Sequence, residues 1–202
     1  MEERERLLEL LARHSYQCSD KPEFKLASGR FSRFYINCKT TTMRREAAPL
    51  IEAAFRPFIP KTAEAVGGLT MGADPIAYAI RDLSHQDLDA FVVRKAAKEH
   101  GLKKLIEGPV KPGMRVVVVD DVVTTGCSTV TAIEECTSEE LKVIAVVVLV
   151  DRQEDDGLSR IREVAGGVPV SAIFNREEVH LRWLDLRTDA DSSSPRSSAT
   201  AG

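Results

Sequence analysis

The chain has 202 residues, with 28 lysines and arginines against 31 aspartates and glutamates and a formal net charge of -3. This length suits one α/β domain with a sizeable core, and the slightly acidic balance argues against a general nucleic-acid-binding surface. No apolar run approaches the ~20 residues that a membrane span requires, and the charged start Met1-Glu-Glu-Arg-Glu-Arg is unlike a signal peptide. We therefore expect a cytoplasmic protein whose partners are neither nucleic acid nor membrane.

The first part of the chain predicts two helices separated by a β-prone segment. Leucines recur at helical spacing in the opening segment 7–11. The segment from Phe31 to Asn37 is aromatic and β-prone, and a second helix is expected from about Glu46 to Phe58, where prolines end it.

From about residue 63 onward, strands alternate with helices. Strands are expected at 63–66, 90–93, 116–119, 143–150 and 168–174, with helices through Ile80 and Cys136. Asn175-Arg-Glu-Glu178 is typical of a capping box that opens a last helix through Trp183. Such alternation predicts a parallel sheet with helices on both faces.

The end of the chain differs in composition. The stretch 188–202 is rich in Ser, Ala and Asp and has no apolar periodicity. We therefore expect a single domain over residues 1–187 and a disordered tail over 188–202.

The run from Val116 to Thr129 carries the clearest chemical signal. Its four valines indicate a strand that is apolar on both faces, and such a strand has no need of Asp120 and Asp121 at its end. Two adjacent carboxylates require compensation by a cation, sugar hydroxyls or solvent. The following Thr-Thr-Gly-Cys-Ser-Thr offers hydroxyls and backbone N–H groups at a helix start, where the dipole favours phosphate. An ordinary βα turn would explain Thr124 or Ser128 as a cap, but not the acidic pair.

This combination resembles the phosphoribosyl diphosphate (PRPP) signature of type I phosphoribosyltransferases. The resemblance implies that the acidic pair holds the ribose hydroxyls and that the turn wraps the 5′-phosphate. The chain lacks the Gly-Lys-Ser/Thr of a Walker-type loop and the spaced glycines of a dinucleotide fingerprint. The PRPP-binding residues implied in this run are Asp120, Asp121, Val122, Val123, Thr124, Thr125, Gly126, Cys127 and Ser128.

The four cysteines show no metal-ligand or redox spacing, so we expect them to be reduced thiols. Cys127 falls in the phosphate turn, where we interpret it as a small residue rather than a nucleophile.

A basic run, Arg94-Lys95-Ala-Ala-Lys98-Glu-His100-Gly, follows a predicted strand. Taken alone, such a run is more often a solvated charged face. Beside the PRPP signature, its cations would stabilise pyrophosphate as it leaves. The run is similar to the mobile catalytic loop of orotate phosphoribosyltransferases, which reaches the active site of the neighbouring subunit. That resemblance implies a homodimer in which Arg94, Lys98 and His100 act in the partner's site and Lys95 in its own.

Three further segments match the same family, namely 24–37, 67–77 and 149–154. The segment 24–37, with Ser28-Gly29-Arg30 before Phe34 and Tyr35, is similar to the N-terminal substrate segment, where aromatic residues and backbone lie over the pyrimidine. For the two aromatic residues, the alternative is plain core packing. The segment 67–77 looks like the pyrophosphate loop, in which small residues let backbone amides approach an anion; there Met71 and Gly72 would contact PRPP.

Arg152 ends a predicted strand. Its guanidinium would grip the orotate carboxylate with two parallel hydrogen bonds, or else form a surface ion pair with Asp151 or Glu154. Its position at the carboxyl end of a strand favours binding. The orotate-binding residues implied by the resemblance are Arg152, Thr124, Phe34 and Tyr35.

The sequence departs from the family pattern at two positions. Many members carry a lysine where Ala27 stands, and some carry one where Gly72 stands. These replacements imply a subgroup in which Lys98, Arg94 and Mg²⁺ bear more of the charge of PRPP.

The resemblance as a whole implies the type I phosphoribosyltransferase fold, which is an α/β fold with a central, mostly parallel sheet flanked by helices and a small N-terminal hood. It implies transfer of the 5-phosphoribosyl group from PRPP to orotate, with Mg²⁺ held mainly through PRPP and water rather than by direct protein ligands. The catalytic residues implied are Lys98, Arg94, His100, Asp120 and Asp121.

Two alternatives remain open. One is a phosphoribosyltransferase for another base, against which Arg152 and the segment 28–30 count. The other is a PRPP-sensing regulator without catalysis, against which the basic run and the lack of an added DNA-binding segment count.

Overall fold

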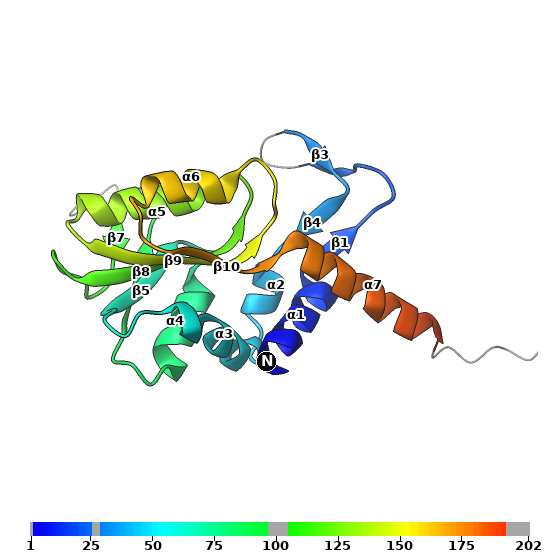
Figure 1. Cartoon of the computed structure of the whole chain (residues 1–202), viewed down its shortest axis with the longest axis horizontal. Helices are drawn as coiled ribbons and strands as arrows, with labels where there is room; N and C mark the ends of the chain where they lie inside the picture. The colour runs from blue at the N-terminus through cyan, green and yellow to red at the C-terminus, as the bar shows by residue number, and fades with distance from the viewer. Residues whose placement is uncertain (1, 26–28, 97–104, 193–202) are drawn as a thin grey trace, which may run out of the picture.

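A central six-stranded sheet organises the part of the chain that the computed structural model describes, which is residues 2–25, 29–96 and 105–192, with side chains as far as Asp189 (Figure 1). The strands run in the order β10-β9-β8-β5-β6-β7. Their bounds are β5 Ala65–Leu69, β6 Asp89–Val93, β7 Ile106–Glu107, β8 Arg115–Val123, β9 Lys142–Asp151 and β10 Val170–Asn175. Neighbouring strands are parallel except for β6 and β7, which are antiparallel. The mostly parallel sheet predicted from the sequence is therefore confirmed.

Helices cover both faces of this sheet (Figure 1). The helices are α1 Glu2–His14, α3 Ala47–Phe55, α4 Asp74–Leu83 and α7 Arg176–Ser192 on one face, and α5 Cys127–Ser138 and α6 Gly157–Val164 on the other. Val117 and Val119 of β8 belong to the core formed with the first group. Val116 and Val118 belong to the core formed with α5 and α6. The valine run is thus buried on both faces, because successive residues of a strand point to opposite sides.

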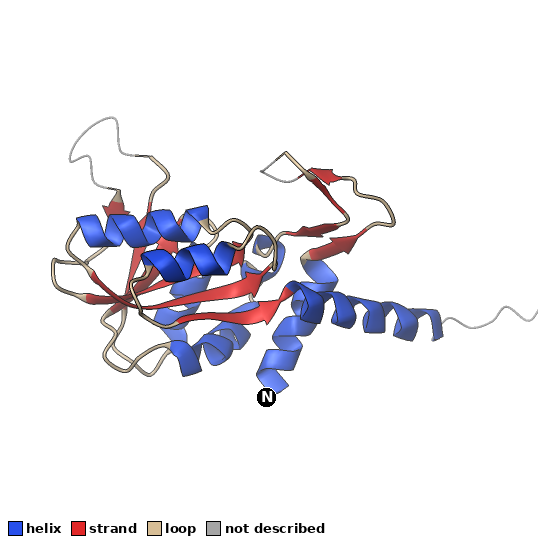
Figure 2. Cartoon of the chain, turned by 45° about the horizontal axis from the view of Figure 1, so that its top comes forward, coloured by secondary structure: helices blue, strands red, loops and turns tan. Residues whose placement is uncertain are grey.

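Two short antiparallel ribbons form a small hood beyond the end of the main sheet (Figure 2). They pair β1 Tyr16–Cys18 with β4 Phe34–Ile36 and β2 Phe24–Lys25 with β3 Phe31–Ser32, and the chain then enters the short helix α2 Lys39–Thr42. Arg30 forms an ion pair with Asp155 in the loop after β9. The hood is therefore fastened over the carboxyl end of that strand.

The acidic pair lies inside β8 rather than after its end. The expected strand ended at Val119, but the strand continues to Val123, and Asp120 is in register with Val148 of β9. Backbone pairing with β9 continues the strand in spite of the charged side chains. The two carboxylates therefore sit on a rigid element.

The last helix begins as the sequence predicts and ends later. The N–H of Asn175 donates to Glu178 Oε2 and the N–H of Glu178 donates to Asn175 Oδ1, both at 2.9 Å, which confirms the capping box. The expected end at Trp183 is wrong, since α7 runs to Ser192 and includes residues 188–192 of the expected tail. Arg182 of α7 lies 2.7 Å from Glu9, so α7 packs on α1 near the end that the sequence predicted. The rest of that stretch, 193–202, lies outside the described residues.

Helix α6 was not anticipated, although Leu158, Ile161 and Ala165 recur at helical spacing. The second predicted helix is split into α3 and the 3-10 turn Arg56–Phe58, within the expected bounds. Over the described part of the chain, no helix is both long and apolar enough to cross a membrane.

Candidate active site

The carboxyl ends of the parallel strands meet at one edge of the sheet. The order in which successive strands are added to the sheet changes direction at β5. The chain passes from β5 to β6 on one side and later places β8 on the other side of β5. Ligands of open α/β sheets bind in the crevice at such a switch point. The loop Thr70–Gly72 after β5 and the acidic pair of β8 lie on the two sides of this point.

Asp120 and Asp121 are buried, at 4% and 5% exposure, and each of their four oxygens has a donor. Asp120 accepts hydrogen bonds from the N–H of Asp121 at 2.9 Å and from Thr129 Oγ1 at 2.7 Å. Asp121 accepts one from the N–H of Val122 at 2.9 Å and one from Lys39 Nζ at 3.2 Å. The burial of two adjacent carboxyl groups is tolerated because each of their four oxygens accepts a hydrogen bond.

The two carboxyl groups differ in their surroundings. Burial, followed by the nearby charge of Asp121, raises the pKa of Asp120 to about 7. Asp121 has an ammonium partner in Lys39, and Asp120 has only neutral donors. The raised pKa therefore belongs to the carboxyl group that has no cationic partner.

The turn after β8 is shaped by close backbone approach. Gly126 has φ 77°, and a Cβ there would lie 2.6 Å from the carbonyl oxygen of Gly157. The left-handed conformation and the lack of space both require glycine. Arg160 of α6 donates to the carbonyl of Thr125 at 2.7 Å and so fastens the turn from the other side. Helix α5 starts directly after the turn, with its N–H groups and positive dipole end toward the site.

Two adjoining cavities contain most of the residues predicted from the sequence. The first, of about 260 Å³, is lined by Lys25, Tyr35, Asp120, Val122, Val123, Thr124, Thr125, Gly126, Cys127, Ser128, Thr129 and Arg152. The second, of about 340 Å³, is lined by Lys39, Leu69, Thr70, Met71, Gly72, Lys95, Asp120, Asp121, Val122 and Ser128. Because Asp120, Val122 and Ser128 line both, the cavities meet at the acidic pair.

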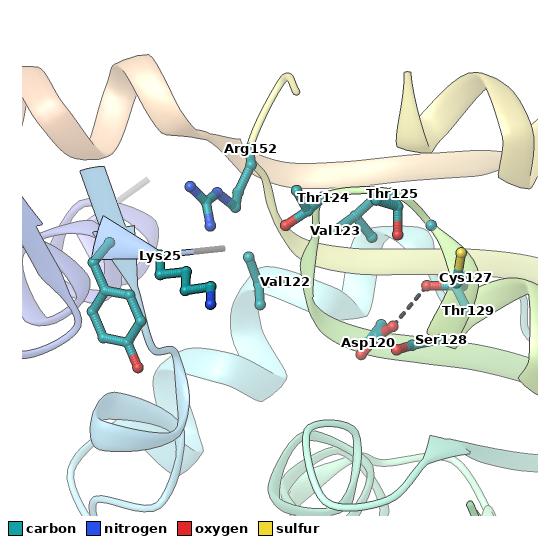
Figure 3. A pocket seen from close by; sticks show the side chains of 12 residues that line it. Lys25, Asp120, Val122, Val123, Thr124, Thr125, Cys127, Ser128, Thr129 and Arg152 are labelled. Carbon is teal, nitrogen blue, oxygen red and sulfur yellow. Dashed lines mark hydrogen bonds between the residues drawn. The ribbon is translucent and has the colours of Figure 1, made fainter. Parts of the chain in front are cut away.

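Figure 3 shows the first cavity with cations at one end and the phosphate-type turn at the other. Lys25 and Arg152 lie on one side, and Ser128 and Cys127 lie on the other (Figure 3). Arg152 is 5% exposed and its Nη2 lies 3.2 Å from Glu154 Oε2. The two interpretations of Arg152 are therefore compatible, since the side chain forms an ion pair with Glu154 and lines the cavity.

The two aromatic residues of the hood separate onto different faces of β4. The centroid of the Phe34 ring lies 6.1 Å from that of Tyr16 and 5.4 Å from that of His180. The Phe34 side chain therefore belongs to an aromatic cluster outside the cavity. Its carbonyl accepts a hydrogen bond from Arg152 at 3.3 Å. Tyr35 lines the cavity and stacks on Phe24 at 5.7 Å. The core-packing alternative thus describes the Phe34 ring, because strand alternation sends neighbours to opposite sides, and a role for Phe34 at the base stays a prediction.

The basic run is described only in part. Lys95 is exposed and lines the second cavity, on the chain that carries it. Arg94 is half-buried and lies 3.4 Å from Glu107 across the β6–β7 pair, and it is not among the residues that line either cavity. Lys98, His100 and Ser28 lie outside the described residues.

The glycines of the expected pyrophosphate loop have two different roles. Gly67 and Gly68 lie inside β5, where a Cβ would meet the backbone oxygens of Phe91 and Val119, each at 2.1 Å. They allow close strand packing rather than anion approach, which corrects the expected boundary of the loop. Gly72 lies in the loop itself, and a Cβ there would lie 2.4 Å from Asp121 Oδ1.

Sequence reasoning missed two lysines that line the cavities. Lys25 reaches the first cavity from β2, and Lys39 reaches the second from the start of α2. Their position within or directly after the segment 24–37 was the available signal. Across residues 2–25, 29–96 and 105–189, no group of three or more His, Cys, Asp or Glu side chains could hold a metal ion. All four cysteines are free thiols.

Comparison with known proteins gives one consistent result. A family model described as the phosphoribosyl transferase domain matches residues 57–174. The orotate phosphoribosyltransferase of Aquifex aeolicus is 43% identical over 183 residues, which are 89% of this chain and 98% of that protein. The Synechocystis sp. enzyme of the same name is 45% identical over 155 residues, covering 75% of this chain and 77% of that protein.

Solved structures agree. The crystal structure of Mycobacterium tuberculosis H37Rv orotate phosphoribosyltransferase in complex with PRPP has a TM-score of 0.68 and 30% identity, and covers 89% of this chain and 92% of that chain. The expected fold class is confirmed. Since the domain model spans more than half of the chain and these relatives match it in sequence over most of their length, the chain belongs to the orotate phosphoribosyltransferase family.

Proposed function

We propose that PRPP occupies the two adjoining cavities and that orotate enters beside it, so that the chain makes orotidine 5′-phosphate and pyrophosphate. The observation that carries this proposal is that both cavities meet at Asp120, with a phosphate-type turn on one side and the loop Thr70–Gly72 with Lys39 and Lys95 on the other. A ribose ring placed at the meeting point would direct its 5′-phosphate to the turn Thr124–Ser128. Its diphosphate would then point to Met71, Gly72 and Lys95.

The acidic pair holds the ribose in this arrangement. Asp120 and Asp121 keep lone pairs beyond those used by their present donors, since each carboxylate oxygen accepts more than one hydrogen bond. These lone pairs accept the ribose hydroxyls and steady the positive charge that develops at C1 as pyrophosphate leaves. The rigid β8 backbone fixes the distance between diol and turn.

Orotate takes the end of the first cavity that Lys25, Tyr35 and Arg152 line. Arg152 Nε is buried and has no hydrogen-bond partner among the described residues, so it is a donor for the substrate carboxylate. Thr124 and the Phe34 backbone complete the base end. The ring nitrogen of orotate attacks C1, and because orotate is itself acidic, a strong protein base is unnecessary.

Mg²⁺ fits this site as an ion carried by the substrate. Carboxylate oxygens suit the ion, but all four oxygens of the acidic pair already accept protein donors. The lone pairs that the acidic pair keeps are those assigned to the ribose hydroxyls. The ion is therefore held through PRPP oxygens and water, where it supplies charge neutralisation to the leaving group.

The proposal includes a homodimer with shared sites. Met43, Tyr78 and Leu83 are 55%, 41% and 44% exposed and line one hollow beside the second cavity's loop, where Met71 is 58% exposed. Exposed apolar side chains gathered in this way suit a second copy of the chain. Across that contact, Arg94, Lys98 and His100 would serve the partner's site. The free thiols suit a cytoplasmic location, where thiols stay reduced.

The test is pyrophosphate release from PRPP and Mg²⁺ with orotate, uracil, hypoxanthine, adenine or no base. Release with orotate alone is expected. Release with another base would overturn the role of Arg152, and PRPP binding without turnover on any base would make the chain a PRPP-sensing regulator. Arg152→Lys keeps the charge but loses the two-pronged grip, so it should raise the KM for orotate while the KM for PRPP stays near that of the wild type.

A further inference from the structure

Lys39 is the residue that links the acidic pair to the second cavity. It is the first residue of α2, and its Nζ lies 3.2 Å from Asp121 Oδ2. The Asp121 side chain is only 7% exposed, whereas the Lys39 side chain is 40% exposed. The ammonium therefore has one side against a buried carboxylate and another side open to the cavity that it lines.

The charged side chains around this cavity leave ammonium protons available to an anion. Its charged lining residues are Lys39, Lys95, Asp120 and Asp121. The carboxylates are already supplied with donors, while an ammonium carries three protons and Lys39 uses one of them on Asp121. The two remaining protons can be donated to an anion that enters between Lys39 and Lys95.

The loop that carries Gly72 cannot provide the same charge. Gly72 lies so close to Asp121 that a Cβ would come within 2.4 Å of Oδ1 and 2.7 Å of Cγ. A longer side chain at that position would push the carboxylate away from its place on β8. A cation for this part of the cavity has to come from another segment, and Lys39 is positioned to be that cation.

We propose that Lys39 binds the diphosphate of PRPP, and the pyrophosphate product, together with Lys95, while it keeps its contact with Asp121. This inference rests on the placement of PRPP given under Proposed function and adds to it a residue from outside the PRPP signature. In the loaded enzyme, the ammonium donates to Asp121 and to a diphosphate oxygen at once.

Two probes separate this role from a purely structural one. Inorganic pyrophosphate with Mg²⁺ reports on the diphosphate end, and ribose 5-phosphate reports on the acidic pair and the turn. Calorimetric titration of Lys39→Met should show pyrophosphate bound about ten- to a hundredfold more weakly, as expected for a lost charge-assisted hydrogen bond. Ribose 5-phosphate affinity should stay within about twofold of wild type, since none of its proposed contacts is removed.

Steady-state kinetics supply a second readout. Lys39→Met should raise the KM for PRPP and leave the KM for orotate unchanged, and Lys39→Arg should recover most of the pyrophosphate affinity. Lys61→Met is the matched control, because Lys61 is exposed before the amino end of β5, at the opposite edge of the sheet. Unchanged pyrophosphate affinity in Lys39→Met would overturn the proposal. Equal weakening of both probes would also overturn it, by assigning Lys39 to the support of Asp121 alone.

An incorrect placement of PRPP would give a different binding result. If wild-type protein binds neither ribose 5-phosphate nor pyrophosphate, the placement of PRPP is wrong and the role of Lys39 falls with it. If wild type binds both, the placement stands and the Lys39 variants alone decide the inference.

Discussion

Thr129 Oγ1 donates a 2.7 Å hydrogen bond to Asp120 Oδ2, so the first turn of α5 holds a buried carboxylate of β8 in place. The phosphate turn and the acidic pair are thereby joined twice, once through the chain and once through this bond. Whatever displaces Asp120 also displaces the start of the helix.

Thr129→Val should therefore destabilise the protein by about 1–3 kcal/mol, because it leaves a buried carboxylate oxygen without its donor. Thr129→Ser retains the hydroxyl and serves as the control. Urea unfolding at pH 8, where Asp120 is ionised, measures the difference. Equal stability of the valine and serine variants would show that the bond contributes nothing.

The raised pKa of Asp120 gives stability a definite pH dependence. The folded-state pKa of about 7 lies above the ordinary value of 3.8, so the folded protein keeps a proton that the unfolded chain has released. The contribution is fully present below about pH 3.8 and is lost as the pH rises through about 7. Unfolding free energies of wild type and Asp120→Asn, measured in steps from pH 5 to pH 8 without ligand, should diverge in favour of the variant. A gap that stays constant over this range would contradict the raised pKa.

Cys127 should be the thiol most open to alkylation. It is exposed, whereas Cys38 and Cys136 are buried, and a hydrogen bond with the Thr125 side chain, followed by the influence of Arg160, lowers its pKa. Iodoacetamide should label Cys127 first and inactivate the enzyme by filling the turn, and PRPP should slow both effects. Peptide mass mapping locates the label.

The matched variants for this experiment are Cys127→Ser and Cys18→Ser. Cys127→Ser keeps the backbone N–H of the turn, and the turnover rate of this variant should not fall when iodoacetamide is added. Cys18→Ser should remain as sensitive as wild type. Full activity of wild type labelled at Cys127 would remove the thiol from the phosphate site.

Shared sites can be tested by mixing inactive subunits. Lys98→Ala and Asp121→Asn should each lower turnover strongly, the first by removing a cation of the basic run and the second by removing a charge of the acidic pair. In a mixed dimer, one site would receive both intact residues, so equal mixing should restore about a quarter of wild-type activity in a twofold-symmetric assembly. Absence of recovery, when native mass spectrometry shows that subunits exchange, would mean that each site is built within one chain.

Strand alternation and helix periodicity could be predicted wherever one stretch of chain carries its own signal. The valine run of β8 is apolar on both faces because the sheet is covered on both faces, and the Asn175–Glu178 capping box is a contact between residues three positions apart. The end of β8 could not be predicted in this way. Its pairing with β9 carries the strand through Asp120, a residue that propensity places outside strands.

At the base end of the site, too, local motifs predicted some features and strand pairing decided others. Tyr35 and Arg152 could be identified as candidates from their motifs, but the turning of the Phe34 ring toward Tyr16 depends on how β4 pairs with β1. Residue 34 and residue 152 are 118 positions apart and meet through one hydrogen bond. No local pattern encodes such a contact.

The sequence by itself determined the acidic pair and the turn, since consecutive residues on a strand, a tight turn and a helix start have nearly fixed relative positions. Only the tertiary structure decided which charges face that motif. Lys39 reaches Asp121 across 82 positions of sequence, and Gly72 excludes a side chain beside the same carboxylate because β5 and β8 are neighbours in the sheet. These charges meet through the crossover of the parallel strands, which brings segments far apart in sequence to one edge of the sheet.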